Sequence, residues 1–149
     1  MSLAAVTVAN SIAGLSVSGV TLKALDEIPE KVDGRDCPII YPNPDGFLSN
    51  LDLEVDSFGS ASAKKTVSYN LNYMYLHSPI GSGRGLFDKY ESVVSSLLAF
   101  FDAVISNDTI TGCVDIQPQD ATSFGPVSDP SGNVFHGCII VLRVTELVN

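Results

Sequence analysis

Two alternating runs of residues constrain the fold of this chain more than any other feature. In the stretch 51–58, three apolar residues alternate with three acidic residues. The apolar set is Leu51, Leu53 and Val55, and the acidic set is Asp52, Glu54 and Asp56. A period of two predicts a β-strand with one buried face and one acidic, solvated face. The alternation returns between Thr66 and His77, so the two runs together predict a long antiparallel hairpin.

A helical period follows this hairpin. Between residues 86 and 106, apolar residues recur at spacings of three and four, which predicts one long amphipathic helix. Asp88 and Glu91 stand in its first turns, where the helix dipole favours acidic side chains. A short helix is also predicted near the N-terminus, with Ser2 as its N-cap.

The remaining strands decide the fold class. The stretch 37-CPIIYP-42 is bounded by prolines, which predicts a short strand near a sheet edge. Residues 110–118 and 134–148 are predicted as a second β pair, and 119–133, rich in turn residues, as the loop between them. The last strand is apolar on both faces, so we expect it in the centre of the sheet. Strands that are grouped rather than alternating with helices predict an α+β fold with a mostly antiparallel sheet.

The composition indicates apolar surface that another protein must cover. Hydrophobic residues make up 45% of the chain and charged residues 17%, against about 25% charged residues in a typical domain. At this length we expect a single domain, residues 1–149, with a core of its own. Because a small domain has few ways to hide excess apolar surface, we expect an oligomer or a part of an assembly.

The charge argues against several kinds of partner. The net charge is −9, with only eight lysines and arginines, which disfavours sequence-specific DNA binding and binding to a membrane surface. The apolar runs are shorter than the roughly 18 to 20 residues that span a bilayer. The stretch 1–15 lacks the basic start of a signal peptide, which predicts a product that stays in the cytoplasm when it is made.

The glycines Gly81, Gly83 and Gly85 raise the question of a nucleotide site. They follow a predicted strand and precede the long helix, which is the order found in phosphate-binding loops. However, the spacing is one residue short of the dinucleotide fingerprint, and Leu86-Phe87 stand where a Walker loop has Lys-Ser/Thr. A chain reversal that uses the conformational freedom of glycine is therefore favoured, and a small-ligand site in the 81–85 loop stays the alternative.

The sequence offers no set of catalytic, metal-binding or cofactor-binding residues. Cys37, Cys113 and Cys138 are far apart and lack the paired spacing of zinc ligands. His77 and His136 stand near the ends of predicted strands without a nucleophile motif beside them. We therefore expect a protein that is not an enzyme and that uses no cofactor or metal.

The order of the elements resembles a known family. The N-terminal helix is followed by 37-CPIIYPNPDGF-47, the long strand 66-TVSYNLNYMYLHSP-79, the glycine turn, one long helix and a closing strand 134-VFHGCIIVLRVTE-146. From about Ser2 to Glu146, this order is similar to the tail terminator (tail completion) proteins of long-tailed bacteriophages and to related neck proteins.

The resemblance implies a structural virion protein that assembles with itself into a ring, commonly a hexamer. Such a ring sits at the head-proximal end of the tail, ends polymerisation of the tail tube and offers a surface for head-tail joining to neck or connector proteins. DNA passes through its lumen without specific binding. The protein is in the host cytoplasm during assembly and in the virion afterwards. The alternatives within this class are a neck stopper or adaptor ring and a tail tube subunit.

Two sets of residues are candidates for contacts. The interface candidates are Arg84, Phe47, Phe58 and Phe124. Arg84 precedes the long helix, and the three phenylalanines stand beside glycine and proline turns, where exposed aromatic side chains would anchor an interface. The alternative is that the phenylalanines fold back onto the core. The candidates for lining the ring lumen, where they would repel DNA, are Asp52, Glu54 and Asp56.

Overall fold

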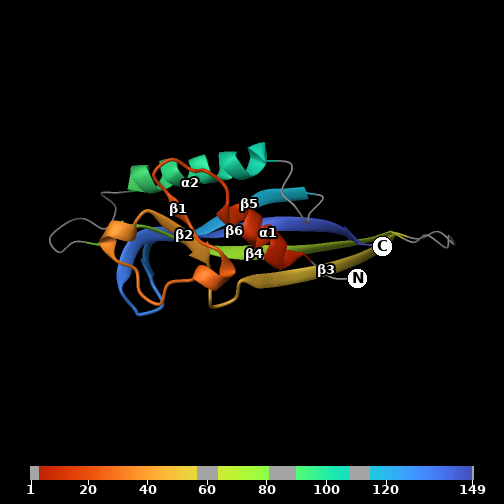
Figure 1. Cartoon of the computed structure of the whole chain (residues 1–149), viewed down its shortest axis with the longest axis horizontal. Coiled ribbons are helices and arrows are strands. Elements are labelled where there is room, and N and C mark those ends of the chain that lie inside the picture. The colour runs from red at the N-terminus through yellow and green to blue at the C-terminus, as the bar shows by residue number, and fades with distance from the viewer. Residues whose placement is uncertain (1–3, 57–63, 81–89, 108–114, 149) are drawn as a thin grey trace.

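The computed structural model describes residues 4–56, 64–80, 90–107 and 115–148 (Figure 1). Within these ranges the α-helices are α1 (Ala5–Ala13) and α2 (Tyr90–Ser106), and short 3-10 turns span Leu25–Glu27 and Gly34–Asp36. The strands are β1 (Thr21–Leu22), β2 (Ile39–Pro42), β3 (Leu48–Asp56), β4 (Lys64–Pro79), β5 (Asp115–Ser128) and β6 (Val134–Val148). Within the described residues these strands form one six-stranded sheet, in which only β1 and β2 pair in parallel. The predicted α+β fold with a mostly antiparallel sheet is confirmed.

The long strand β4 organises the sheet. On one side, β2 pairs with the end of β4 around Leu76, and β3 pairs with the other end around Val67. On the other side, β6 pairs along nearly the whole of β4, and β5 lies beyond β6. The antiparallel β3–β4 hairpin and the central position of β6 agree with the sequence prediction. β3, β4 and β6 run together to the end of the molecule where the C-terminus lies (Figure 1).

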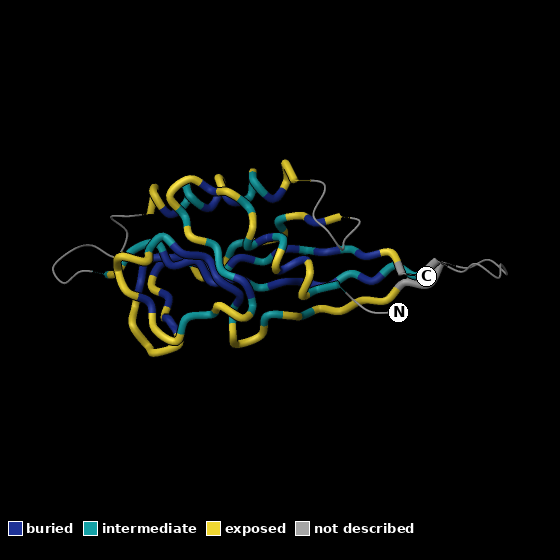
Figure 2. The backbone as a smooth tube through the Cα atoms, in the orientation of Figure 1, coloured by how far each residue is buried: buried dark blue, intermediate teal, exposed yellow. Residues whose placement is uncertain are grey.

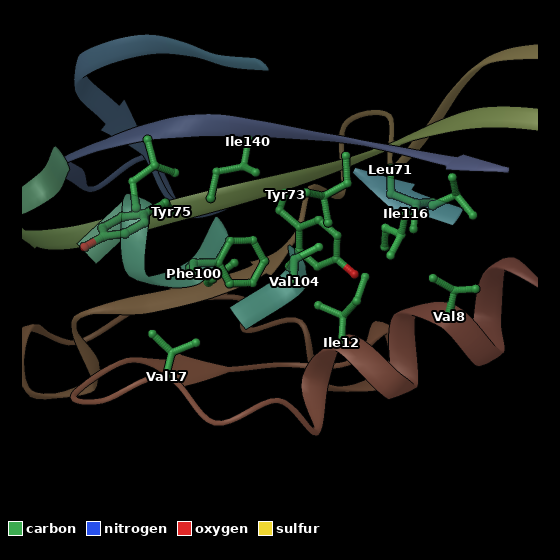
Figure 3. Close-up of a cluster of buried hydrophobic side chains, with 14 of the residues drawn as sticks. Val8, Ile12, Val17, Leu71, Tyr73, Tyr75, Phe100, Val104, Ile116 and Ile140 are labelled. Atoms are coloured by element: carbon green, nitrogen blue, oxygen red, sulfur yellow. The ribbon is translucent and has the colours of Figure 1, made fainter. Parts of the chain in front are cut away.

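The main core lies between the two helices and one face of the sheet. The period-two face of β4 supplies a row of buried side chains: Val67, Tyr69, Leu71, Tyr73 and Tyr75. α1 adds Val8 and Ile12, and α2 adds Leu97, Phe100 and Val104. Side chains from both helices point at Tyr73 (Figure 3). Each buried side chain of this size contributes about 1.5–3 kcal/mol of transfer free energy, so this face holds the fold together.

A second, smaller core covers part of the opposite face. It contains the side chains Val32, Ile39, Tyr41, Met74, Leu76, Val127 and Phe135. The carboxylate of Asp129, which is buried, ties this region together by accepting hydrogen bonds from the backbone N–H groups of Val32 (2.9 Å) and Asn133 (2.8 Å). The half of β4 that pairs with β2 is therefore covered on both faces.

The N-terminal helix begins differently from the prediction. Its N-cap is Ala4, not Ser2, and Ala4 has no side chain that can cap. The carboxylate of Glu146 takes this role, because its two oxygens accept the Ala4 N–H at 2.9 and 3.1 Å. The Tyr69 hydroxyl donates a hydrogen bond to the same carboxylate. The cap is tertiary, so a search for Ser, Thr, Asp or Asn beside the helix was bound to miss it.

The predicted loop 119–133 is also wrong over most of its length, because β5 continues to Ser128. Pro118 and Pro126 lie in this strand, and the β5–β6 pairing shifts register after Pro118 and after Thr122. Prolines and irregularities are tolerated here because β5 is an edge strand, whose outer side pairs with no other strand among the residues that the structure describes. For α2, the predicted first turns (86–89) lie outside the described residues, and so does 110–114 of the predicted strand.

Candidate functional site

The outer edge of β3 is open within the described part of the chain. Among the described residues, β3 pairs with β4 alone. Its side chains Leu48, Leu51 and Leu53 are 47%, 56% and 60% exposed. The prediction that Leu51 and Leu53 belong to a buried face is therefore wrong, while the side chain of Val55 lies outside the described part. We call Leu48, Leu51 and Leu53 the β3 patch; it follows the exposed strand along the lower edge of Figure 2.

A bulge within the β3 patch is held by one arginine of β6. The β3–β4 register shifts between Ser49 and Asp52, and Asn50 has a positive φ of 51°. Arg143 donates from one nitrogen to the backbone oxygen of Asn50 at 2.9 Å and from the other to the Asp52 carboxylate at 3.1 Å. It also donates to Asn70 on β4 at 3.0 Å. A single guanidinium of β6 thus fixes the shape of β3 through groups on β3 and β4.

The three lumen candidates are placed only in part. Asp52 is exposed, on the sheet face opposite the main core, but its charge is paired with Arg143. In the β3–β4 pairing, Glu54 lies opposite Thr66, and Asp56 lies opposite Lys64. The side chains of Glu54 and Asp56 lie outside the described residues. Of the three acidic side chains, only Asp52 is described, and Arg143 of β6 supplies its cation.

The edge formed by β5 contrasts with the edge formed by β3. β5 contains Pro118 and Pro126, which lack the N–H that an added strand would need. Two breaks in register and the positive φ of Ser123 (58°) and Gly125 (122°) bend its outline. Prolines and bulges are the usual protection of an edge against pairing with another chain. β3 has a bulge but no proline, and it carries exposed leucines.

An apolar groove lies between α2 and the start of β5. Its volume is about 660 Å³, and its apolar lining consists of Leu98, Phe101, Ile105, Ile116 and Pro118. Leu98 and Ile105 are 58% and 63% exposed. The carboxylates of Asp102 and Asp115 flank it, and no lysine or arginine is among its described lining residues. We call this the α2–β5 groove.

The sequence of α2 carries a signal for this groove. The apolar positions of α2 form two neighbouring rows, of which 93, 97, 100 and 104 are buried. The second row, at 94, 98, 101 and 105, lies beside the first and includes the two most exposed large apolar side chains in the described helix. A single apolar stripe is enough to pack a surface helix on a sheet. The second row instead leaves Leu98 and Ile105 exposed beside the groove.

The aromatic interface candidates that can be placed pack inward. Phe47 is partly buried and meets the ring of Tyr73 edge-on at 5.6 Å. Phe124 is also partly buried against the main core, with its ring 5.7 Å from that of Tyr90. For these two residues the alternative, folding back onto the core, describes the structure better. Phe58 and Arg84 lie outside the described residues, as does the glycine loop 81–85.

A second pocket, of about 330 Å³, lies beside the small core. Tyr41 and Asp129 are among its lining residues, and the hydroxyl of Tyr41 is buried without a hydrogen-bond partner among the described residues. Burial, followed by the nearby Asp129 and Cys37, raises the pKa of Tyr41. Although burial alone would raise it, hydrogen bonds from Val32 and Asn133 hold the pKa of Asp129 below its usual value. The phenol thus stays protonated and the carboxylate stays saturated, so neither is suited to act as a base.

His77 is hydrogen-bonded, and Cys37 and Cys138 are held protonated. Nδ1 of His77 lies 2.7 Å from the hydroxyl of Tyr75, and the two rings stack. Burial raises the pKa of the Cys37 thiol to about 11 and that of Cys138 to about 12, so both are protonated at neutral pH and poor nucleophiles. Within the described residues, no group of three or more His, Cys, Asp or Glu side chains is placed to hold a metal. Cys113 lies outside them.

The function of these surfaces has to be inferred from their own residues and charges. No protein-family model matches the chain, and a search of curated proteins finds no match either. No helix in the described ranges is both long and apolar enough to cross a membrane.

Proposed function

We propose that this chain is a structural virion protein that forms a ring at the head-proximal end of a bacteriophage tail. The ring would end polymerisation of the tail tube and offer the head-tail joining surface. The phage assignment rests on the order of elements along the sequence. The assembly rests on one observation of the structure, the open edge of β3 with its exposed leucines. A chain that stayed alone would leave this apolar edge in water.

The chemistry of the other surfaces fits such a role. A docking component works by surface complementarity and needs no reactive groups. Burial keeps the hydroxyl of Tyr41 and the thiol of Cys138 protonated. The net charge of −9 suits a lumen through which DNA passes without binding, because phosphates meet few cations there.

Electron microscopy of the purified protein, with and without tail tubes, tests this function. We expect closed rings of uniform size, a single ring at one end of each tube, and tubes that no longer grow from that end. A protein that stays monomeric at high concentration and leaves tubes free to elongate would contradict the proposal. A protein that polymerises into long tubes by itself would support the alternative of a tail tube subunit.

Two further measurements separate the remaining alternatives. A neck stopper or adaptor ring would bind the connector and leave the growth of isolated tail tubes unchanged. A small-ligand protein using the 81–85 loop would gain thermal stability with a nucleotide, since a ligand at 100 times its dissociation constant adds about 2.7 kcal/mol. A screen of nucleotides that leaves the melting temperature unchanged would exclude that reading.

A further inference from the structure

We propose that the β3 patch of one copy binds in the α2–β5 groove of a second copy, so that successive copies join head to tail. The inference rests on the ring assembly proposed above and specifies its contact. The occupant of the groove is the same chain, and the contact uses two different surfaces of it. A contact of this kind is heterologous, and only heterologous contacts build rings of more than two subunits by one repeated interface.

The two surfaces have matching apolar character. The β3 patch presents three leucines, and the groove presents Leu98 and Ile105 at similar exposure. In the β3–β4 pairing, Leu48 lies opposite Leu71 and Leu53 lies opposite Val67. Leu71 and Val67 are members of the main core. Ile116 and Pro118, at the start of β5, line the groove as well. Seating one surface in the other would remove both sets of side chains from water.

The charges favour the same pairing. The groove is flanked by Asp102 and Asp115. The β3 patch brings Asp52, but Arg143 already pairs with its carboxylate at 3.1 Å. A cation lies near the patch on the neighbouring strand. Lys65 of β4 is opposite Val55 of β3, two residues along the hairpin from Leu53. The acidic groove therefore meets an apolar strand whose described acid is neutralised and whose neighbour is basic.

Pairing of β3 with β3 of a second copy is less favourable. The bulge between Ser49 and Asp52 interrupts the continuous ladder that a second β3 would have to form. Such a contact is also isologous, so it closes at a dimer. Ladder pairing with β5 of a second copy is opposed by Pro118 and Pro126.

The position of the two surfaces on the sheet suits a closed ring. β3 and β5 are opposite edges of the part of the sheet ordered β3-β4-β6-β5. The pairings place Leu48, Leu71, Leu142 and Pro118 in one row across these four strands. A second row contains Asp52, Ser68, Thr145 and Asp115. The β3 patch and the groove thus lie at the same level along the strands on opposite edges of this part of the sheet, so a head-to-tail contact between copies can repeat around a ring.

Two variants of the full chain test this contact. Leu51→Lys with Leu53→Lys alters only the patch, and Leu98→Lys with Ile105→Lys alters only the groove, at side chains of similar exposure. Each variant keeps one intact surface. We expect each alone to be monomeric by light scattering, and an equal mixture to form a one-to-one dimer and nothing larger. Val134→Lys, at another exposed apolar side chain, is the matched control and should assemble like the unaltered chain.

Other outcomes would overturn the contact. Rings that persist in either double variant would show that the ring uses a different interface, while the proposed function stands. Two monomeric variants that give no dimer when mixed would also contradict it. An unaltered chain that is monomeric at every concentration, with or without tail tubes, would end both proposals.

A cross-linking experiment guards against variants that fail to fold. Leu53→Cys with Ile105→Cys in one chain should give covalent ladders between copies on oxidation, because the proposed contact brings the patch that carries one sulfur into the groove that carries the other. Leu53→Cys with Val134→Cys carries the same number of added thiols and should give none. Equal ladders from the two pairs, or ladders from the control alone, would contradict the proposed contact.

Discussion

β2 and β3 pair with the same side of the same strand, yet one is buried and the other is exposed. All four residues of β2 are buried, whereas Leu48, Leu51 and Leu53 of β3 are largely in contact with water. β2 has β1 beside it and the small core on one of its faces. Among the described residues, β3 has only β4 beside it. The burial of a strand is therefore decided by the elements that cover it. The alternation of apolar and acidic residues in β3 is clearer than any pattern in β2, but it predicts only that the segment is a strand and not whether its apolar side chains are covered.

The largest expected effect comes from β2. Ile40 is 1% exposed and belongs to the main core. Ile40→Ala should lower the free energy of unfolding by about 2–5 kcal/mol, because it removes buried methyl groups and leaves a cavity. Urea denaturation followed by circular dichroism measures this. An effect below about 0.5 kcal/mol, the range of surface substitutions, would show that β2 is as exposed as β3.

The cap of α1 should matter next. Glu146→Gln leaves a neutral acceptor facing the Ala4 N–H and the Tyr69 hydroxyl, and it removes the negative charge at the helix N-terminus. We expect a loss of about 1–2 kcal/mol, in the range measured for removed caps and for hydrogen bonds to charged groups. Hydrogen exchange of the α1 amides should rise more than that of α2. Equal changes in both helices would contradict a local cap.

Asp129 should make the free energy of unfolding depend on pH, because its hydrogen bonds hold together the region of the small core that covers one face of β2. Its folded-state pKa is lowered, so the stabilisation is fully present above its unfolded pKa of about 3.9 and is lost as the pH falls through the folded-state value. Asp129→Asn should remove this pH dependence, so its stability should fall less steeply than that of the unaltered chain over that acidic range. Parallel pH profiles for the two proteins would contradict the assignment.

The smallest effect on stability is expected in β3. Leu53→Ala removes a side chain that is 60% exposed, so the free energy of unfolding should change by no more than about 0.5 kcal/mol. The measurement must be made on the monomer, at a concentration below assembly. A loss of 2 kcal/mol or more, roughly that of a buried leucine, would mean that β3 is covered within its own chain.

The parts of the fold that follow from local pattern were predictable. The β3–β4 hairpin, the helix through Tyr90–Ser106 and the central strand β6 each follow from a period or an apolar run that the chain carries in itself. The strand through 119–128 was not, because its turn residues are tolerated only at an edge. The candidate site was missed at Leu51, Leu53 and the outer row of α2. Those residues have the pattern of core residues, and their exposure depends on neighbours that the pattern does not name.

The sequence by itself determined most of the segments that are strands or helices, though not the strand through 119–128, since backbone periods and turn residues act over a few neighbouring positions. Only the tertiary structure decided how each segment is used. Glu146 caps a helix 142 residues away along the chain, and Arg143 neutralises Asp52 from the far side of β4. Such contacts depend on distances in space, and these are set by the packing of the whole chain around its core. For the same reason the exposed leucines of β3 became visible as a surface only when the sheet was complete.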